Sequence, residues 1–167
     1  MKIENPAAFS FILQDEIYLL DQDKIKPGRN LVPTPIIETE KDHFKYLGGY
    51  RKKLLLIVYY PAMEFMAPDH LEALGKVLTR LNFGVDDIAI LNIANQPNAM
   101  FSDIMDFFKP QKLLLLGEKA LPGGIESLTL NAPKQFNNCG TLLSFSFDEM
   151  MDNQEYKKAF WEEIKKL

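Results

Sequence analysis

The stretch KPQKLLLLGEKAL, residues 109–121, decides the fold class. Four consecutive leucines end at Gly117, and a charged pair and small apolar residues follow. An apolar run that does not alternate with polar residues is typical of a parallel strand covered on both faces. In open α/β sheets ligands bind outside the carboxyl ends of such strands, so the turn at Gly117 is also a candidate ligand site.

Similar apolar runs and amphipathic segments alternate on both sides of this stretch. A helix is expected over 69–83, with Asp69 as its cap and Gly84 at its end. Further strands are expected at 52–61, 85–94, 127–131 and 140–147, and further helices at 98–109 and from Asp152 or Asn153 to Leu167. This alternation predicts right-handed βαβ units. The expected fold is therefore a three-layer α/β domain, with a mainly parallel sheet and helices on both faces.

The first 50 residues are less regular. Residues 1–20 hold two apolar clusters, which we interpret as a short helix followed by a short strand. Residues 21–50 are polar and rich in proline and glycine, as in a long surface connection. Residues 1–167 are thus expected to form a single domain, in which 1–50 is a less regular segment and 51–167 is the α/β core.

Composition limits the classes of partner. The net charge is −4, from 19 Lys+Arg and 23 Asp+Glu, which argues against broad, charge-driven binding to nucleic acid. The run Arg51–Lys53 is a local exception, and we interpret it as a solvated turn, with a small basic patch as the alternative. No signal peptide and no apolar stretch of membrane-spanning length is seen, and Cys139 is the single cysteine. We expect a cytoplasmic protein that does not enter a membrane.

The motifs that bind cofactors or metals are missing. Neither glycine-rich phosphate fingerprint occurs, and Tyr60-Pro61 is bulky at the strand end where a nucleotide would sit. The lone Cys139 and the two isolated histidines, His43 and His70, do not have the spacing of a zinc site. The sequence predicts no cofactor, no metal and no catalytic residue. Five acids lie near strand ends: Glu64, Glu118, Glu126, Asp148 and Glu149. We interpret each as a helix cap or a solvated loop residue, and the alternative is that one of them is a general acid or base.

Two adjacent blocks resemble the middle of the uracil-DNA glycosylase superfamily. They are IAILNIANQPN (88–98) and FKPQKLLLLGEKAL (108–121). In that family an asparagine on a strand recognises uracil, and Asn92 is its nearest counterpart here. The chain departs from the family where the glycine-rich, water-positioning turn should follow the first strand, since VYYPAME stands there. It departs again at SFSFDEMM, which replaces a His-Pro-Ser type loop. Tyr60, Asn92 and Gly117 are therefore expected to mark only a vestigial pocket.

The chain also resembles the psi-subunit family of the bacterial DNA polymerase III holoenzyme, which has this fold without its catalysis. The resemblance rests on FILQDEIYLLD (11–21), on the spacing of the first strand, helix and second strand, and on DNQEYKKAFWEEIKKL (152–167). It implies a non-enzymatic accessory subunit that tethers a clamp loader through its N-terminal segment and binds a chi-like subunit through its globular part.

The contact residues that this resemblance implies are Phe9, Phe11, Ile12 and Leu13. The alternative is that these four pack on the domain's own sheet. No direct binding to nucleic acid is expected. Three other functions stay open: a divergent uracil-DNA glycosylase, a flavodoxin-like small-molecule binder, and an orphan domain with an unrelated partner.

Overall fold

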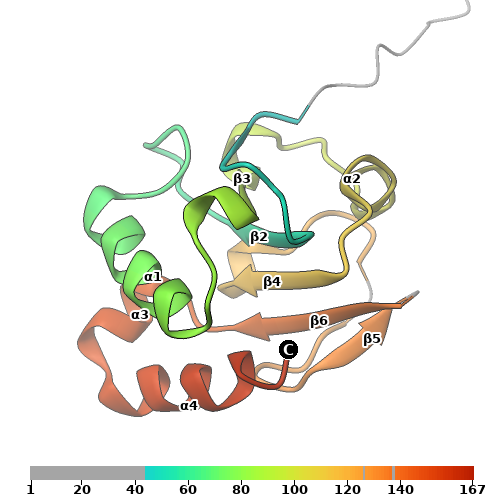
Figure 1. Ribbon diagram of the computed structural model, residues 1–167. Coiled ribbons are helices and arrows are strands. Elements are labelled where there is room, and N and C mark those ends of the chain that lie inside the picture. The colour runs from blue at the N-terminus through green and yellow to red at the C-terminus, as the bar shows by residue number, and fades with distance from the viewer. Residues whose placement is uncertain (1–43, 126, 137) are drawn as a thin grey trace, which may run out of the picture. The chain divides into compact units, whose positions relative to one another are not determined.

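A computed structural model describes residues 44–125, 127–136 and 138–167 of the chain (Figure 1). These residues all belong to one compact unit, Lys41–Leu167. The strands are β1 (Tyr46–Leu47), β2 (Leu54–Val58), β3 (Ile88–Asn92), β4 (Lys112–Leu116), β5 (Lys134–Phe136) and β6 (Cys139–Ser144). The helices are α1 (Pro68–Arg80), α2 (Phe101–Phe108), α3 (Phe147–Asp152) and α4 (Gln154–Ile164), with short 3₁₀ turns η3 (Val85–Asp87), η4 (Ile93–Asn95) and η5 (Glu118–Ala120).

The strands form a six-stranded sheet in the order β1-β3-β2-β4-β6-β5. The four inner strands are parallel, and both edge strands pair antiparallel with their neighbours. Leu56 in the middle of β2 lies opposite Ile90 of β3 and Leu114 of β4. The fold is thus a mixed α/β domain with a mostly parallel sheet, as the continuous apolar runs predict.

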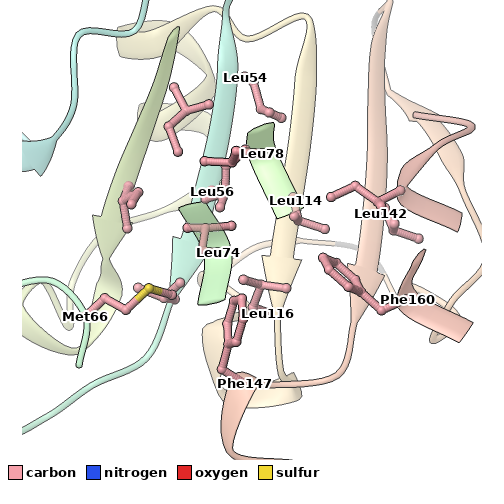
Figure 2. Packing of buried hydrophobic residues seen from close by; sticks show 14 of the residues in the cluster. Leu54, Leu56, Met66, Leu74, Leu78, Leu114, Leu116, Leu142, Phe147 and Phe160 are labelled. Atoms are coloured by element: carbon pink, nitrogen blue, oxygen red, sulfur yellow. The ribbon is translucent and has the colours of Figure 1, made fainter. Parts of the chain in front are cut away.

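The core lies on both faces of this sheet, because successive strand residues point to opposite sides. Leu54, Leu56 and Val58 of β2 pack on one face with residues of α1, α3 and α4. Leu55 and Ile57 pack on the other face with Ile104 and Phe108 of α2. Figure 1 shows the same division of the helices, and Figure 2 shows Leu74 and Leu78 of α1 lying over Leu56. The expected three layers are confirmed.

Three expectations about individual segments are wrong. Residues 127–131 form no strand, apart from an isolated bridge between Leu130 and Leu143, and the edge strand is β5 instead. The segment 140–147 leaves the sheet at Ser144, and Phe147 already begins α3. The connection at 21–50 contains β1, which pairs with β3. Sheet edges are hard to predict because a short strand with one neighbour carries little apolar pattern.

The ends of α1 also differ from expectation. Asp69 lies in the first turn, and the N-cap is Ala67, followed by a proline at the first helical position. The helix ends at Arg80, and Asn82 takes the left-handed conformation (φ 59°) that ends it. Gly84 instead caps η3, where its N–H donates to the Asp87 carboxylate at 2.9 Å.

Candidate functional site

The carboxyl ends of β2 and β4 are the place where this topology would hold a ligand. From β2 the chain crosses to β3 on one side through α1 and returns to β4 on the other side through α2. Because α1 and α2 cover opposite faces, the direction of winding reverses between β2 and β4. Open α/β sheets bind ligands at such a switch point. The sequence-predicted residues Tyr60, Asn92 and Gly117 all follow or end these inner strands.

Asn92, the last residue of β3, is buried with 2% exposure and holds the loop that follows β2. Its Oδ1 accepts from the N–H of Tyr60 at 2.9 Å and from the N–H of Ala94 at 3.2 Å. Its Nδ2 donates to the carbonyls of Tyr60 at 2.8 Å and Met63 at 2.9 Å, with a longer contact to Glu64 at 3.4 Å. An amide side chain has two acceptor positions and two donors, so its capacity is filled by backbone.

A second asparagine supports the same loop from outside. Asn95 of η4 is exposed, and its Nδ2 donates to the carbonyls of Met63 at 3.0 Å and Glu64 at 2.9 Å. Asn92 and Asn95 therefore act together as a clasp on residues 60–64. Asn92 thus lies beside Tyr60, and its contacts give it a structural role in the loop.

Tyr60, His70 and Phe147 form a small polar and aromatic cluster beside this clasp. The Tyr60 hydroxyl lies 2.8 Å from Nδ1 of His70 in the first turn of α1, and the imidazole stacks on Phe147 with ring centroids 5.7 Å apart. Burial, and then the negative charge of Asp148, raise the pKa of Tyr60 above its ordinary value. An ordinary tyrosine is already protonated at neutral pH, so the shift makes deprotonation of this phenol harder still. Figure 2 shows Phe147 beside Leu116 at the carboxyl end of β4.

Gly117 is required by the close approach of two chain segments. Its φ is +93° and its ψ is 151°, a region that is essentially open only to glycine. A Cβ at this position would lie 3.0 Å from the Cβ of Ser146, after β6. Its N–H donates to the carbonyl of Ser144 at 2.8 Å. These contacts account for the glycine as a turn residue, as expected from the sequence.

The acidic residues at these strand ends mostly have structural partners. Glu149 and Ser146 form a capping box on α3, in which Oε2 of Glu149 accepts from the Ser146 N–H at 2.8 Å. Glu64 pairs with Lys45, and Glu118 lies in the first turn of η5. Glu126 lies outside the described residues. Within the described ranges no three His, Cys, Asp or Glu residues come together as a metal site would need.

The other sequence-predicted residues lie elsewhere. Cys139 is buried at the start of β6, and burial raises the pKa of its thiol, which makes it a poor nucleophile at neutral pH. Phe9, Phe11, Ile12 and Leu13 lie outside the described residues. Sequence reasoning missed His70 and Ser146. The pattern Ser146-x-x-Glu149 is a capping-box signal that could have placed Ser146 at a helix start, whereas no local signal links His70 to Tyr60.

No known family model matches the chain, and a search of curated proteins gives no match either. In the part of the chain that the structure describes, no helix has the length and apolar composition needed to cross a bilayer.

Proposed function

We propose that this chain is a non-enzymatic interaction subunit with a uracil-DNA glycosylase-like fold, similar in role to the psi subunits of bacterial DNA polymerase III. The observation that carries the proposal is the state of Asn92. A base-reading asparagine must offer free amide groups to a ligand. Here both donors and one acceptor position bind backbone of the loop after β2, and the other acceptor position binds the N–H of Ala94 in η4.

The surroundings of Asn92 support the same conclusion. An enzyme that extracts a base combines a pocket for the base with contacts to the phosphate backbone. Here the loop after β2 crosses the position in front of Asn92, and its backbone is bound at Tyr60, Met63 and Glu64. The acids Asp148 and Glu149 stand after β6, where they would repel phosphates.

A small-molecule binder is the second candidate, and the strand order favours it. The parallel strands β3-β2-β4-β6 have the order second-first-third-fourth along the chain, as in flavodoxin-like folds, which bind a ligand between the first and third strands. The glycine-free turn after β2 is the feature that opposes it. A flavin or nucleotide released when the purified protein is denatured would favour this candidate.

Capture of clamp-loader subunits from the same cell tests the proposal. The full chain should retain them, and deletion of residues 1–14 should abolish retention. A finer variant, Phe9→Ser with Phe11→Ser, should weaken it, while Leu19→Ser with Leu20→Ser in the second apolar cluster serves as the matched control.

A uracil-excision assay on single- and double-stranded oligonucleotides completes the test. We expect no uracil release from the full chain. Turnover that disappears in a folded Asn92→Ala variant would overturn the proposal in favour of a glycosylase. In the capture experiment, equal retention of clamp-loader subunits with and without residues 1–14 would contradict the psi-like role.

A further inference from the structure

The amino ends of the strands carry a cavity that the proposed function does not use. Its volume is about 150 Å³. Its wall is formed by the first residues of β2 and β4, by residues that follow α1, and by residues at and after the end of α4. The lining residues are Leu54, Leu81, Phe83, Lys112, Ile164, Lys165 and Leu167. We call this site the lysine-rimmed cavity.

Two aromatic rings hold cations around this cavity. The Phe83 ring has Nζ of Lys52 at 4.8 Å and Nζ of Lys112 at 5.9 Å from its centroid. The Trp161 ring on α4 has Nζ of Lys165 at 5.6 Å and the guanidinium carbon of Arg80 at 5.9 Å. Such contacts position a cation without neutralising it.

The charges at the rim are only partly compensated. Lys52 forms an ion pair with Asp87, Nζ to Oδ2 3.0 Å. Among the described residues, neither Lys112 nor Lys165 has a carboxylate within ion-pair distance. The chain as a whole carries a charge of −4, so this rim is a local region of positive charge on an acidic protein. A partner with negative charge would be attracted to it.

The cavity's size and lining specify the remaining chemistry. The cavity opens to solvent, and its wall combines Leu, Ile and Phe side chains with two lysines. Its volume of about 150 Å³ equals that of a closed apolar cavity that holds benzene in another protein, so one side chain of that size would fit. We propose that the lysine-rimmed cavity docks an acidic segment of a partner protein, which inserts one benzene-sized apolar side chain and places carboxylates near Lys112 and Lys165. The inference goes beyond the proposed function and is independent of it, because the residues that carry it all lie within 52–167.

The aromatic contacts favour an acidic peptide over a nucleic acid. Proteins that bind single strands stack bases on aromatic faces along a positively charged groove. Here the Phe83 and Trp161 rings already hold cations, so a stacked base would have to displace them. A single side chain entering the cavity leaves these contacts in place.

The chain contains its own reporter for this site. Trp161 is the single tryptophan, and it lies beneath Lys165 at the rim. The probe is a fluorescein-labelled peptide with one phenylalanine between two pairs of aspartates. Its binding to the full chain is followed by anisotropy and, with unlabelled peptide, by Trp161 emission. Matched probes replace the phenylalanine by serine, or all aspartates by asparagine, and a thymidine oligonucleotide tests the nucleic-acid alternative.

The variant Lys112→Gln with Lys165→Gln should weaken binding of the phenylalanine peptide by about five- to tenfold, as expected for two charge contacts that water reaches, one half-buried and one exposed. Lys76→Gln with Lys158→Gln removes the same charge from α1 and α4 away from the cavity and should leave the affinity unchanged. Leu167→Phe, which enlarges a side chain of the cavity wall, should abolish the preference for phenylalanine over serine without adding a second tryptophan.

The proposal is overturned if a folded chain does not bind the peptide, if both double variants bind alike, or if the oligonucleotide binds in place of the peptide. The peptide-binding assays use the full chain and no clamp-loader subunit. A negative result in them therefore does not bear on the psi-like role, and a negative capture experiment does not bear on the cavity.

Discussion

The two ends of the parallel sheet differ in how their polar groups are used. At the carboxyl ends, where this topology would hold a ligand, the Asn92 amide binds backbone of the loop after β2 and of η4. At the amino ends, Lys112 and Lys165 surround an apolar cavity and rest against aromatic rings. The topology indicates where α/β sheets usually bind a ligand, whereas the side chains at that position decide whether polar groups remain available to one.

The difference follows from the chemistry of the two ends. An amide is neutral, and backbone donors and acceptors satisfy it completely. An ammonium group over an aromatic ring stays charged and keeps its attraction for an anion. The lysines at the amino ends can therefore still bind an anion. The predictions for the carboxyl ends concern protein stability, and they test whether the residues there serve to hold the loops together.

The largest effect is expected for Asn92→Ala. The variant leaves backbone carbonyls of Tyr60 and Met63 without their buried donor, and N–H groups without their acceptor. We expect the free energy of unfolding to fall by about 3 kcal/mol, as for several backbone groups left unsatisfied. Urea unfolding monitored by circular dichroism measures the change.

Asn95→Ala is the matched control for this variant. Asn95 donates to the carbonyls of Met63 and Glu64 from an exposed position, so water can replace it, and the loss should be about 1 kcal/mol or less. Equal losses for the two variants would contradict the view that burial of Asn92 closes this end of the sheet.

A smaller effect is expected for Gly117→Ala. Alanine at a φ of +93° is strained, and its Cβ would lie 3.0 Å from the Cβ of Ser146. The expected loss is about 2 kcal/mol. Gly75→Ala is the control, because nothing lies within 4 Å of a Cβ there, and in the middle of α1 it should stabilise the protein by about 0.5–1 kcal/mol. Thermal melts of the two variants should shift in opposite directions; a shift in the same direction would remove the steric explanation of Gly117.

The elements with strong sequence patterns were predicted, and those without them were not. Buried strands β2, β3 and β4 appear as continuous apolar runs, and the spacing of Leu74 and Leu78 gives the inner face of α1. Edge strand β1 has two residues and β5 has three, and such short strands carry too little periodicity. Helix α3 was missed because the apolar residues before it extend the pattern of β6.

For the candidate residues, the sequence order gives the sheet end at which they lie, and it does not give their contacts. That Tyr60 and Asn92 share one end of the sheet follows from their places after parallel strands. The hydrogen bonds of Asn92 depend on the path of residues 60–64, which no local pattern encodes. The lysine-rimmed cavity joins Phe83, Lys112 and Lys165 from three distant segments, so only the packed fold brings it together.

The smallest expected effect concerns pH and compares one tyrosine at each end. Burial raises the pKa of Tyr60 at the carboxyl ends and of Tyr50, whose hydroxyl donates to the carbonyl of Phe108 at 3.1 Å near the amino ends. Below a pH of about 10, the ordinary tyrosine pKa, folded and unfolded chains both keep these protons. Above it the unfolded chain loses them first. Stability should therefore decline by up to about 1.4 kcal/mol per pH unit for each group until the folded-state pKa is passed.

Tyr60→Phe and Tyr50→Phe should each make this alkaline decline shallower than in the unaltered chain. Unfolding free energies from urea titrations at pH 9, 10 and 11 give the three slopes. Tyr60 differs from Tyr50 in having His70 and Asp148 beside it. Asp148 is the second cause of the raised Tyr60 pKa, after burial. Asp148→Asn should therefore lower the folded-state pKa of Tyr60 and bring the rise in tyrosinate absorbance of the folded chain to a lower pH, while leaving Tyr50 unaffected. An absorbance titration unchanged by Asp148→Asn would mean that burial alone raises the pKa of Tyr60.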